Sequence, residues 1–367
     1  MTSLFARATR RIGLGHIRHV RPVGWTAANG LVRQVYRQME TDFGLLAPPL
    51  VLHAASPESL AATWLMLRET LVAGGQVDRA AKEVVAAAVS LANACPYCVD
   101  VHGAVLAGLL RSADADAVAA DRIDDVADPR LRAIARWARG SGLAAPGGTP
   151  AAPFPQTHAP ELIGVAVTFH HINRMVSVFL SDSPLPAVPP ATETVLRRFA
   201  ARMMGGLASA RVEPGRSLDL LPEPPLGAAG GDDLAWAGPP AAAPAVAGAL
   251  RRAAATIDGI GARSVPEPVR RLVHARLASA AADLPGISTR DWLDGVVAAL
   301  PDRLRAQGRL AVLVAVAAYR VTDDLVAEVR AQGGGDAAVV ELASWASFAA
   351  ARHIGAALGR GLPAQPQ

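Results

Sequence analysis

Apolar side chains recur every three or four residues along most of this chain, which is the spacing of one face of an amphipathic helix. In the first half this spacing predicts helices over residues 51–71, 79–93, 96–110, 131–139 and 161–180. Asp78 stands where the second helix needs an N-cap, and Pro96 suits the first turn of the third. The first half of the chain is therefore expected to be helical.

The helical pattern is interrupted in the middle of the chain and then resumes. Residues 184–190 predict a turn, and residues 192–207 predict one more helix. Residues 214–244 are dense in proline, glycine and alanine without a sustained period, which indicates a linker or a long surface loop. Helical spacing returns from Ala245 to Leu358, with breaks near Pro266, Pro285, Pro301 and Gly333–Gly335.

The two halves share a weak similarity. A shift of 222 residues lays Ala311–Arg330 on Val89–Gly108, and Leu313, Tyr319 and Val321 then match Leu91, Tyr97 and Val99. Three identities in twenty positions leave a diverged repeat an open question, because alanine-rich helices resemble one another by composition alone.

Composition favours an all-α protein. The 367 residues suffice for about two domains. With 51% hydrophobic and 19% charged residues the chain is not disordered as a whole, and its two cysteines exclude a disulfide-rich scaffold. Much of the hydrophobic fraction is alanine, the best helix former, whereas β-folds need branched and aromatic residues.

Charge and hydropathy identify no large partner. The net charge is +4 and shows no basic cluster of the kind that binds nucleic acid. The longest apolar runs, such as Leu310–Tyr319, are shorter than the ~18–20 residues of a membrane span. The arginines before Glu40 lack the apolar core of a secretory signal and are interpreted as a solvated leader. We therefore expect a cytoplasmic protein, whose cysteines are reduced, catalytic or metal-bound.

Both cysteines lie in one short motif, Cys95-Pro96-Tyr97-Cys98. If a helix begins at Pro96, Cys95 is its N-cap and Cys98 lies in its first turn. Unpaired N–H groups and the helix dipole stabilise a thiolate there and lower the thiol pKa.

Two further residues complete a candidate constellation. His102 lies four residues after Cys98, on the same helix face, within reach of its sulfur directly or through one water. Glu83 lies on the preceding helix, which an antiparallel turn brings back toward His102, where a carboxylate would orient the imidazole. Together these residues form a base-activated dithiol.

The dithiol also has other interpretations. A c-type haem needs histidine directly after the second cysteine, where Val99 stands. Structural zinc needs four ligands, and only three candidates are local. A thioredoxin motif should follow a strand, whereas the segments on both sides of this motif are predicted to be helices. A further alternative is that the two cysteines are small buried side chains with no chemistry.

The spacing Glu83, Cys95, Cys98 and His102 resembles the active-site signature of the alkylhydroperoxidase D branch of the carboxymuconolactone decarboxylase superfamily. The segment Phe169–Met175 also resembles a downstream helix of relatives. The resemblance covers about residues 48–180. It implies an all-helical fold that forms homo-oligomers.

The resemblance also implies a chemistry. Cys98 would be the nucleophile toward a hydroperoxide substrate, His102 and Glu83 a proton relay, and Cys95 the resolving thiol that forms a redox-active disulfide. An external dithiol, on a lipoylated or thioredoxin-like protein, would reduce that disulfide. No cofactor and no metal are implied. Tyr97, His170 and His171 are weaker candidates for the substrate pocket.

The resemblance leads to a division of the chain. Residues 1–45 would be a leader, 46–208 an alkylhydroperoxidase D-like catalytic domain, 209–244 a linker and 245–367 a degenerate helical domain. In the shifted alignment, the four motif positions of the second half hold Arg305, Ala317, Arg320 and Asp324. The second of the tandem helical lobes would thus have lost the chemistry.

Two alternatives to a peroxidase remain open. One is a non-redox metal-binding or assembly module, and the other is a lactone decarboxylase-type lyase, suggested by superfamily analogy alone.

Overall fold

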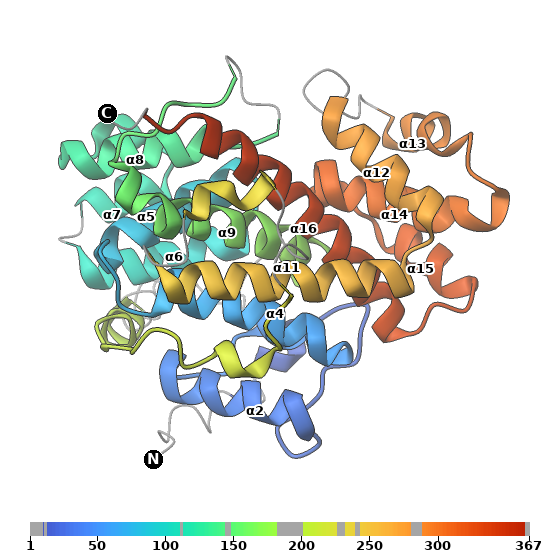
Figure 1. The fold of residues 1–367 in the computed structure, drawn as a ribbon, viewed down its shortest axis with the longest axis horizontal. Helices are drawn as coiled ribbons and strands as arrows, with labels where there is room; N and C mark the ends of the chain where they lie inside the picture. The colour runs from blue at the N-terminus through green and yellow to red at the C-terminus, as the bar shows by residue number, and fades with distance from the viewer. Residues whose placement is uncertain are drawn as a thin grey trace, which may run out of the picture.

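The computed structural model describes residue 10 and residues 13–110, 113–143, 148–181, 201–225, 232–238, 243–279 and 288–363. These residues form helices, and the only β-type pairing among them is a single bridge between Ile17 and Leu180. The prediction of an all-α protein is therefore confirmed (Figure 1).

The first lobe holds most of the predicted helices near their expected bounds. The predicted ones are α5 (Arg79–Ala92), α6 (Pro96–Leu109), α8 (Pro129–Arg139) and α9 (Ala159–Phe179). The lobe also contains α2 (Gly30–Gln38), α3 (Pro48–Val51), α4 (Pro57–Leu67) and α7 (Ala113–Ala119). The single helix expected over residues 51–71 is wrong, because the chain leaves the helical conformation at Ser56. Pro57 explains the break, since a proline disfavours a helical conformation in the residue before it.

The second lobe begins after the proline-rich segment. It comprises α11 (Pro244–Ser264), α12 (Glu267–Ser279), α13 (Thr289–Val297), α14 (Asp302–Ala317), α15 (Asp323–Ala331) and α16 (Asp336–Arg360). The breaks expected near Pro266, Pro301 and Gly333–Gly335 are confirmed. Pro285 and residues 184–190 lie outside the described residues, and of the helix expected over 192–207 the structure describes the end, helical over 201–208.

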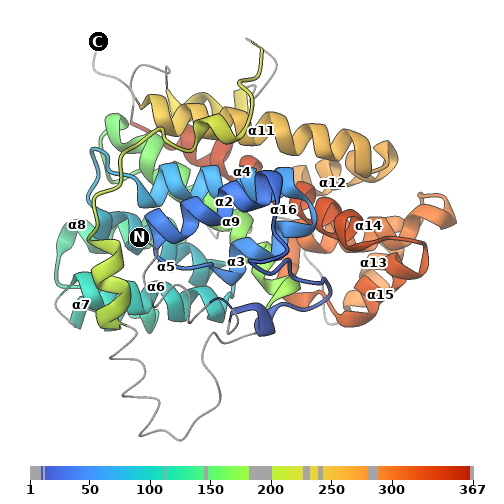
Figure 2. The ribbon, with the colours of Figure 1, turned by 90° about the horizontal axis from the view of Figure 1, so that it is seen from below.

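The two lobes share a core built around two long helices. α9 packs along α16, and α4 packs along α11, as the central green, red, blue and gold helices show (Figures 1 and 2). Within the first lobe α5 packs on α6 and α9, and within the second lobe α14 packs on α15 and α16. The second lobe thus repeats the helix contacts of the first, as expected of tandem helical lobes.

The central helix α9 is apolar enough to be mistaken for a membrane span. Residues Gln156–Phe179 are long and apolar enough to cross a membrane, although the apolar runs in the sequence predicted no such segment. In the folded protein, 94% of the most apolar 18-residue stretch of this helix is buried. Such burial is typical of the core helix of a folded domain.

Two segments outside the main helices are fastened to the first lobe. The N-terminal segment is held where Arg18 N donates to Phe179 O at 2.7 Å, and α2 packs on α4. The segment after residue 208 is held by a buried ion pair, in which Arg68 contacts Glu69 and Asp42. Glu69 also accepts hydrogen bonds from Gly215 N at 2.7 Å and Ser217 Oγ at 2.6 Å. The domain boundaries given above stay a prediction.

Glu69→Ala is expected to lower the free energy of unfolding by about 3 kcal/mol, because it leaves the buried Arg68 with one carboxylate fewer. Urea denaturation followed by circular dichroism measures the change. Glu58→Ala is the matched control, since it removes a pair with Arg263 on the surface and costs at most about 1 kcal/mol. If the two variants lost equal amounts of unfolding free energy, the buried Arg68–Glu69 pair would contribute no more to stability than a surface pair.

Candidate functional site

The turn between α5 and α6 positions both cysteines. After α5 ends, Ala94 N donates to Leu91 O and Cys95 N donates to Ser90 O at 3.0 Å. These two bonds, with Ala94 in the left-handed region at φ +49°, form the Schellman arrangement that closes a helix. An alanine there is strained by about 1 kcal/mol relative to glycine. The new helix begins immediately at Pro96, so the expected N-cap position of Cys95 is confirmed.

Both cysteine thiols are free and buried. Cys95 is 1% exposed and Cys98 is 2% exposed. Cys95 makes no side-chain hydrogen bond to the helix terminus that it caps. The Cys95 thiol lies near the Cys98 thiol.

A buried hydrogen bond connects Glu83 to His102. Glu83 Oε2 lies 2.6 Å from His102 Nδ1, and Glu83 Oε1 accepts from Arg79 Nε at 2.8 Å. Burial alone would raise the pKa of Glu83, but the Arg79 charge and the hydrogen bond with His102 bring it below its ordinary value. A carboxylate on Nδ1 places the Nδ1 proton on that bond and leaves Nε2 as the basic nitrogen.

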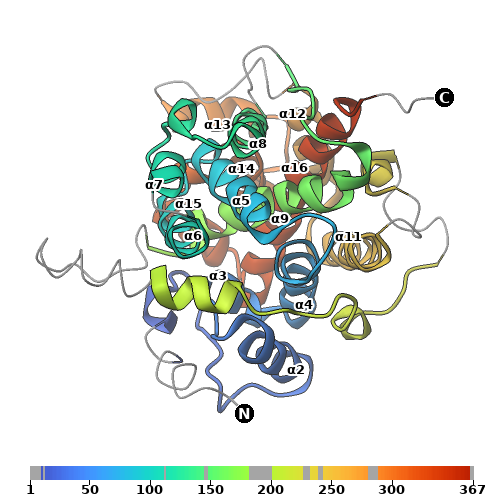
Figure 3. The same ribbon diagram turned by 90° about the vertical axis from the view of Figure 1, so that its left-hand side faces the viewer.

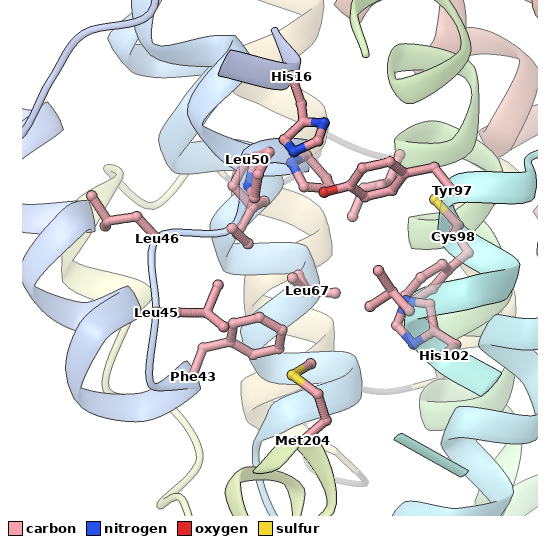
Figure 4. Close-up of a pocket in the computed structure, with 16 residues that line it drawn as sticks. His16, Phe43, Leu45, Leu46, Leu50, Leu67, Tyr97, Cys98, His102 and Met204 are labelled. Atoms are coloured by element: carbon pink, nitrogen blue, oxygen red, sulfur yellow. The ribbon is translucent and has the colours of Figure 1, made fainter. Parts of the chain in front are cut away.

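Cys98 and His102 line one apolar cavity of about 210 Å³ (Figure 4). His102 also meets the edge of Phe169, with ring centres 4.6 Å apart. The cavity is lined by residues from distant parts of the chain, namely His16, Phe43, Leu45–Leu50, Leu67, Tyr97, Val101, Phe169, Ile172 and Met204. Cys95 and Glu83 are not among its lining residues and so lie behind the two that are.

The helix over residues 201–208 reaches the cavity by packing closely on α6 (Figure 3). Gly108 and Gly205 face each other, and a Cβ atom on Gly108 would lie 2.9 Å or less from three backbone atoms of this helix. Only glycine allows this approach, which brings Met204 to the cavity.

The environment of Cys98 differs from the expectation of a lowered thiol pKa. Burial raises the pKa of Cys98 well above its ordinary value, and the hydrogen bond with Cys95 raises it further. A hydrogen bond from Asn173 acts in the opposite direction. The desolvation of the Cys98 thiolate therefore outweighs its stabilisation by the helix N-terminus. Removing a thiolate from water costs more free energy than the partial positive charge at one helix end provides.

Of the weaker pocket candidates, Tyr97 lines the cavity and the two histidines do not. His170 Nε2 lies 2.9 Å from Ser141 Oγ. His171 lies between the lobes, and its Nδ1 atom is 2.7 Å from Ser347 Oγ of the second lobe. Burial lowers the pKa of both imidazoles. Successive residues of a helix point about 100° apart, so Phe169 and Ile172 face the cavity while positions 170 and 171 face other helices.

Several residues of the site carried no recognisable signal in the sequence. His16, Phe43 and Met204 reach the cavity from segments remote from the motif, and only the fold brings them there. Asn173 is a short polar side chain within the apolar run of α9 and is fully buried.

The second lobe keeps the helices without the reactive groups. Both cysteines of the chain lie in the first lobe. At the corresponding positions, Arg305 donates to the carbonyls of Leu300 and Ala298, and Arg320 donates to Thr289 Oγ1. Within the described ranges, no three His, Cys, Asp or Glu side chains are grouped so as to hold a metal ion.

Comparisons with known proteins agree with the motif. Residues 58–140 match the carboxymuconolactone decarboxylase family. The alkyl hydroperoxide reductase Rv2159c of Mycobacterium tuberculosis is 38% identical over 343 residues, which cover 94% of this chain and 95% of the relative. A solved alkylhydroperoxidase AhpD core, from a peroxidase-related protein of Ralstonia eutropha JMP134, covers 51% of this chain and 96% of its own. Its sequence identity is 20% and its TM-score 0.40.

Proposed function

Because the chain belongs to the alkylhydroperoxidase D-like branch of the carboxymuconolactone decarboxylase family, we propose that it is a peroxidase that reduces organic hydroperoxides through Cys98 and Cys95. The observation that carries the proposal is that Cys98 shares an apolar cavity with His102, whose Nδ1 is held by a buried carboxylate. The similarity to a protein named alkyl hydroperoxide reductase supports the same reaction.

The cavity suits the organic part of such a substrate. Its walls are mostly leucine, proline, phenylalanine and methionine side chains. Each methylene group of an alkyl hydroperoxide buried there gains about 0.8 kcal/mol. The peroxide group would then lie at the polar end of the cavity, where Cys98 and His102 are found.

The first step is a two-electron oxidation of Cys98. His102 Nε2 accepts the thiol proton, directly or through one water, and the thiolate attacks the terminal peroxide oxygen. An S–O bond forms while the O–O bond breaks, and the leaving alkoxide takes a proton from His102 to become an alcohol. A base is needed because burial keeps the resting Cys98 protonated.

The second step uses the resolving thiol. The Cys95 sulfur attacks the Cys98 sulfenic acid, so that an S–S bond forms, the S–O bond breaks and water leaves. Cys95 is suited to this role because it contacts Cys98 from behind the cavity. An external dithiol, of the lipoylated or thioredoxin-like kind, then reduces the disulfide from the cavity side of Cys98.

The second lobe would act as a built-in partner in the proposed enzyme. It covers α9 with α16 and α4 with α11, and it supplies no lining residue of the cavity. Its contribution would therefore be to hold the helices that shape the site. Formation of a homo-oligomer remains a prediction.

The two cysteines are expected to respond differently to substitution. Cys98→Ser removes the nucleophile and should abolish hydroperoxide turnover. Cys95→Ser should still consume about one equivalent of hydroperoxide without forming an internal disulfide, because the resolving thiol is missing. Peroxide consumption and intact mass measure both outcomes, and full turnover by either variant would contradict the proposal.

His102→Ala should lower kcat/KM for an organic hydroperoxide by about 100-fold or more, the usual contribution of a general acid–base. Glu83→Gln should lower it in the same direction, because the amide no longer favours the reactive tautomer. His158→Ala is the control, since the side chain of His158, the N-cap residue of α9, makes no capping hydrogen bond and does not line the cavity. A His102→Ala variant as fast as the parent protein would rule out the relay.

A further inference from the structure

We infer that His16 and Tyr97 form a subsite for a carboxyl group, so that the preferred substrate is the hydroperoxide of an organic acid. The inference rests on the proposed function and names its substrate class. Four polar side chains stand among the apolar residues that line the cavity. Two of them, Cys98 and His102, take part in the proposed reaction. His16 and Tyr97 are the other two, and that reaction gives them no task.

The residues at the end of α9 hold His16 at the cavity. Ile17 forms a β-bridge with Leu180, and Ser181 N donates to His16 O at 3.2 Å. The imidazole is held as well, since His16 Nδ1 lies 3.0 Å from Ser181 Oγ. With Nδ1 engaged, Nε2 is the nitrogen that can serve a ligand. Because α9 also forms one wall of the cavity, this anchor fixes His16 relative to a bound substrate.

Tyr97 reaches the cavity from the first turn of α6. In Figure 4 its ring extends from α6 toward His16, so that its hydroxyl group points away from Cys98. Burial raises the pKa of Tyr97, and the hydroxyl group therefore keeps its proton and stays a hydrogen-bond donor at neutral pH. A donor that faces an apolar cavity favours a ligand with an acceptor at that point.

A carboxyl group matches this pair of side chains. One of its oxygens accepts a hydrogen bond from the Tyr97 hydroxyl group. The other shares a proton with His16 Nε2, either as a carboxylate with imidazolium or as an acid with neutral imidazole. A purely apolar substrate would leave both side chains without these bonds.

The exposure of the two polar regions fits a substrate with two different ends. His16 is partly exposed, whereas Cys98 is 2% exposed. A carboxylate beside His16 would therefore retain part of its hydration, which lowers the free-energy cost of its burial. The hydroperoxide group would lie deeper, at Cys98 and His102, and the apolar body of the substrate would contact the cavity walls.

The test compares two substrates that share one carbon skeleton, cumene hydroperoxide and its para-carboxyl derivative. The parent protein should consume the carboxylated substrate with a kcat/KM about tenfold higher. Tyr97→Phe, which removes only the hydroxyl group, and His16→Leu should each lower the ratio of the two kcat/KM values about tenfold. Phe43→Leu is the matched control, because it alters an apolar wall of the same cavity and should leave that ratio unchanged.

Binding of an unreactive ligand separates this inference from the proposed function. The Cys98→Ser variant is titrated calorimetrically with para-isopropylbenzoate, which has the same skeleton without the peroxide group. Adding Tyr97→Phe should raise the dissociation constant about tenfold. If it does so but the parent protein consumes no hydroperoxide, the carboxyl subsite stands and the proposed function fails. An unchanged dissociation constant, or a parent protein that consumes both hydroperoxides equally well, would overturn the inference.

Discussion

Glu83 is a fully buried carboxylate, and the site depends on how its two oxygens are paired. One oxygen binds Arg79 one turn away on α5, and the other binds His102 on α6. A carboxylate without these partners would be too costly to bury. The pair joins α5 to α6 and holds His102 on the side of α6 that also carries Cys98, since both residues line the same cavity.

Access to Cys98 is controlled by parts of the chain that carry no chemistry. The N-terminal segment, α3, α4, α9 and residues 201–208 together enclose the cavity, and the second lobe supports α4 and α9 from behind. This enclosure has a cost, because it keeps the resting thiol protonated. In the proposed mechanism His102, on the cavity side, offsets this cost by removing the thiol proton.

The sequence carried the local features of the site and little of its surroundings. Asp78, Pro96 and the spacing from Glu83 to His102 operate within two adjacent helices, so helix geometry sufficed to place them. Phe43 and Met204 reach the cavity only through tertiary packing, which no local pattern records. The expected low thiol pKa was wrong because it considered the helix terminus and not the burial that the fold imposes.

We propose that Cys98 and Cys95 form a dithiol that a hydroperoxide oxidises directly. The most direct test is the intact mass and thiol content of the reduced protein, before and after one equivalent of an organic hydroperoxide. We expect the protein to lose two hydrogens and both thiols within seconds, with no added oxygen retained. Thiols that remain unchanged over many minutes would contradict it.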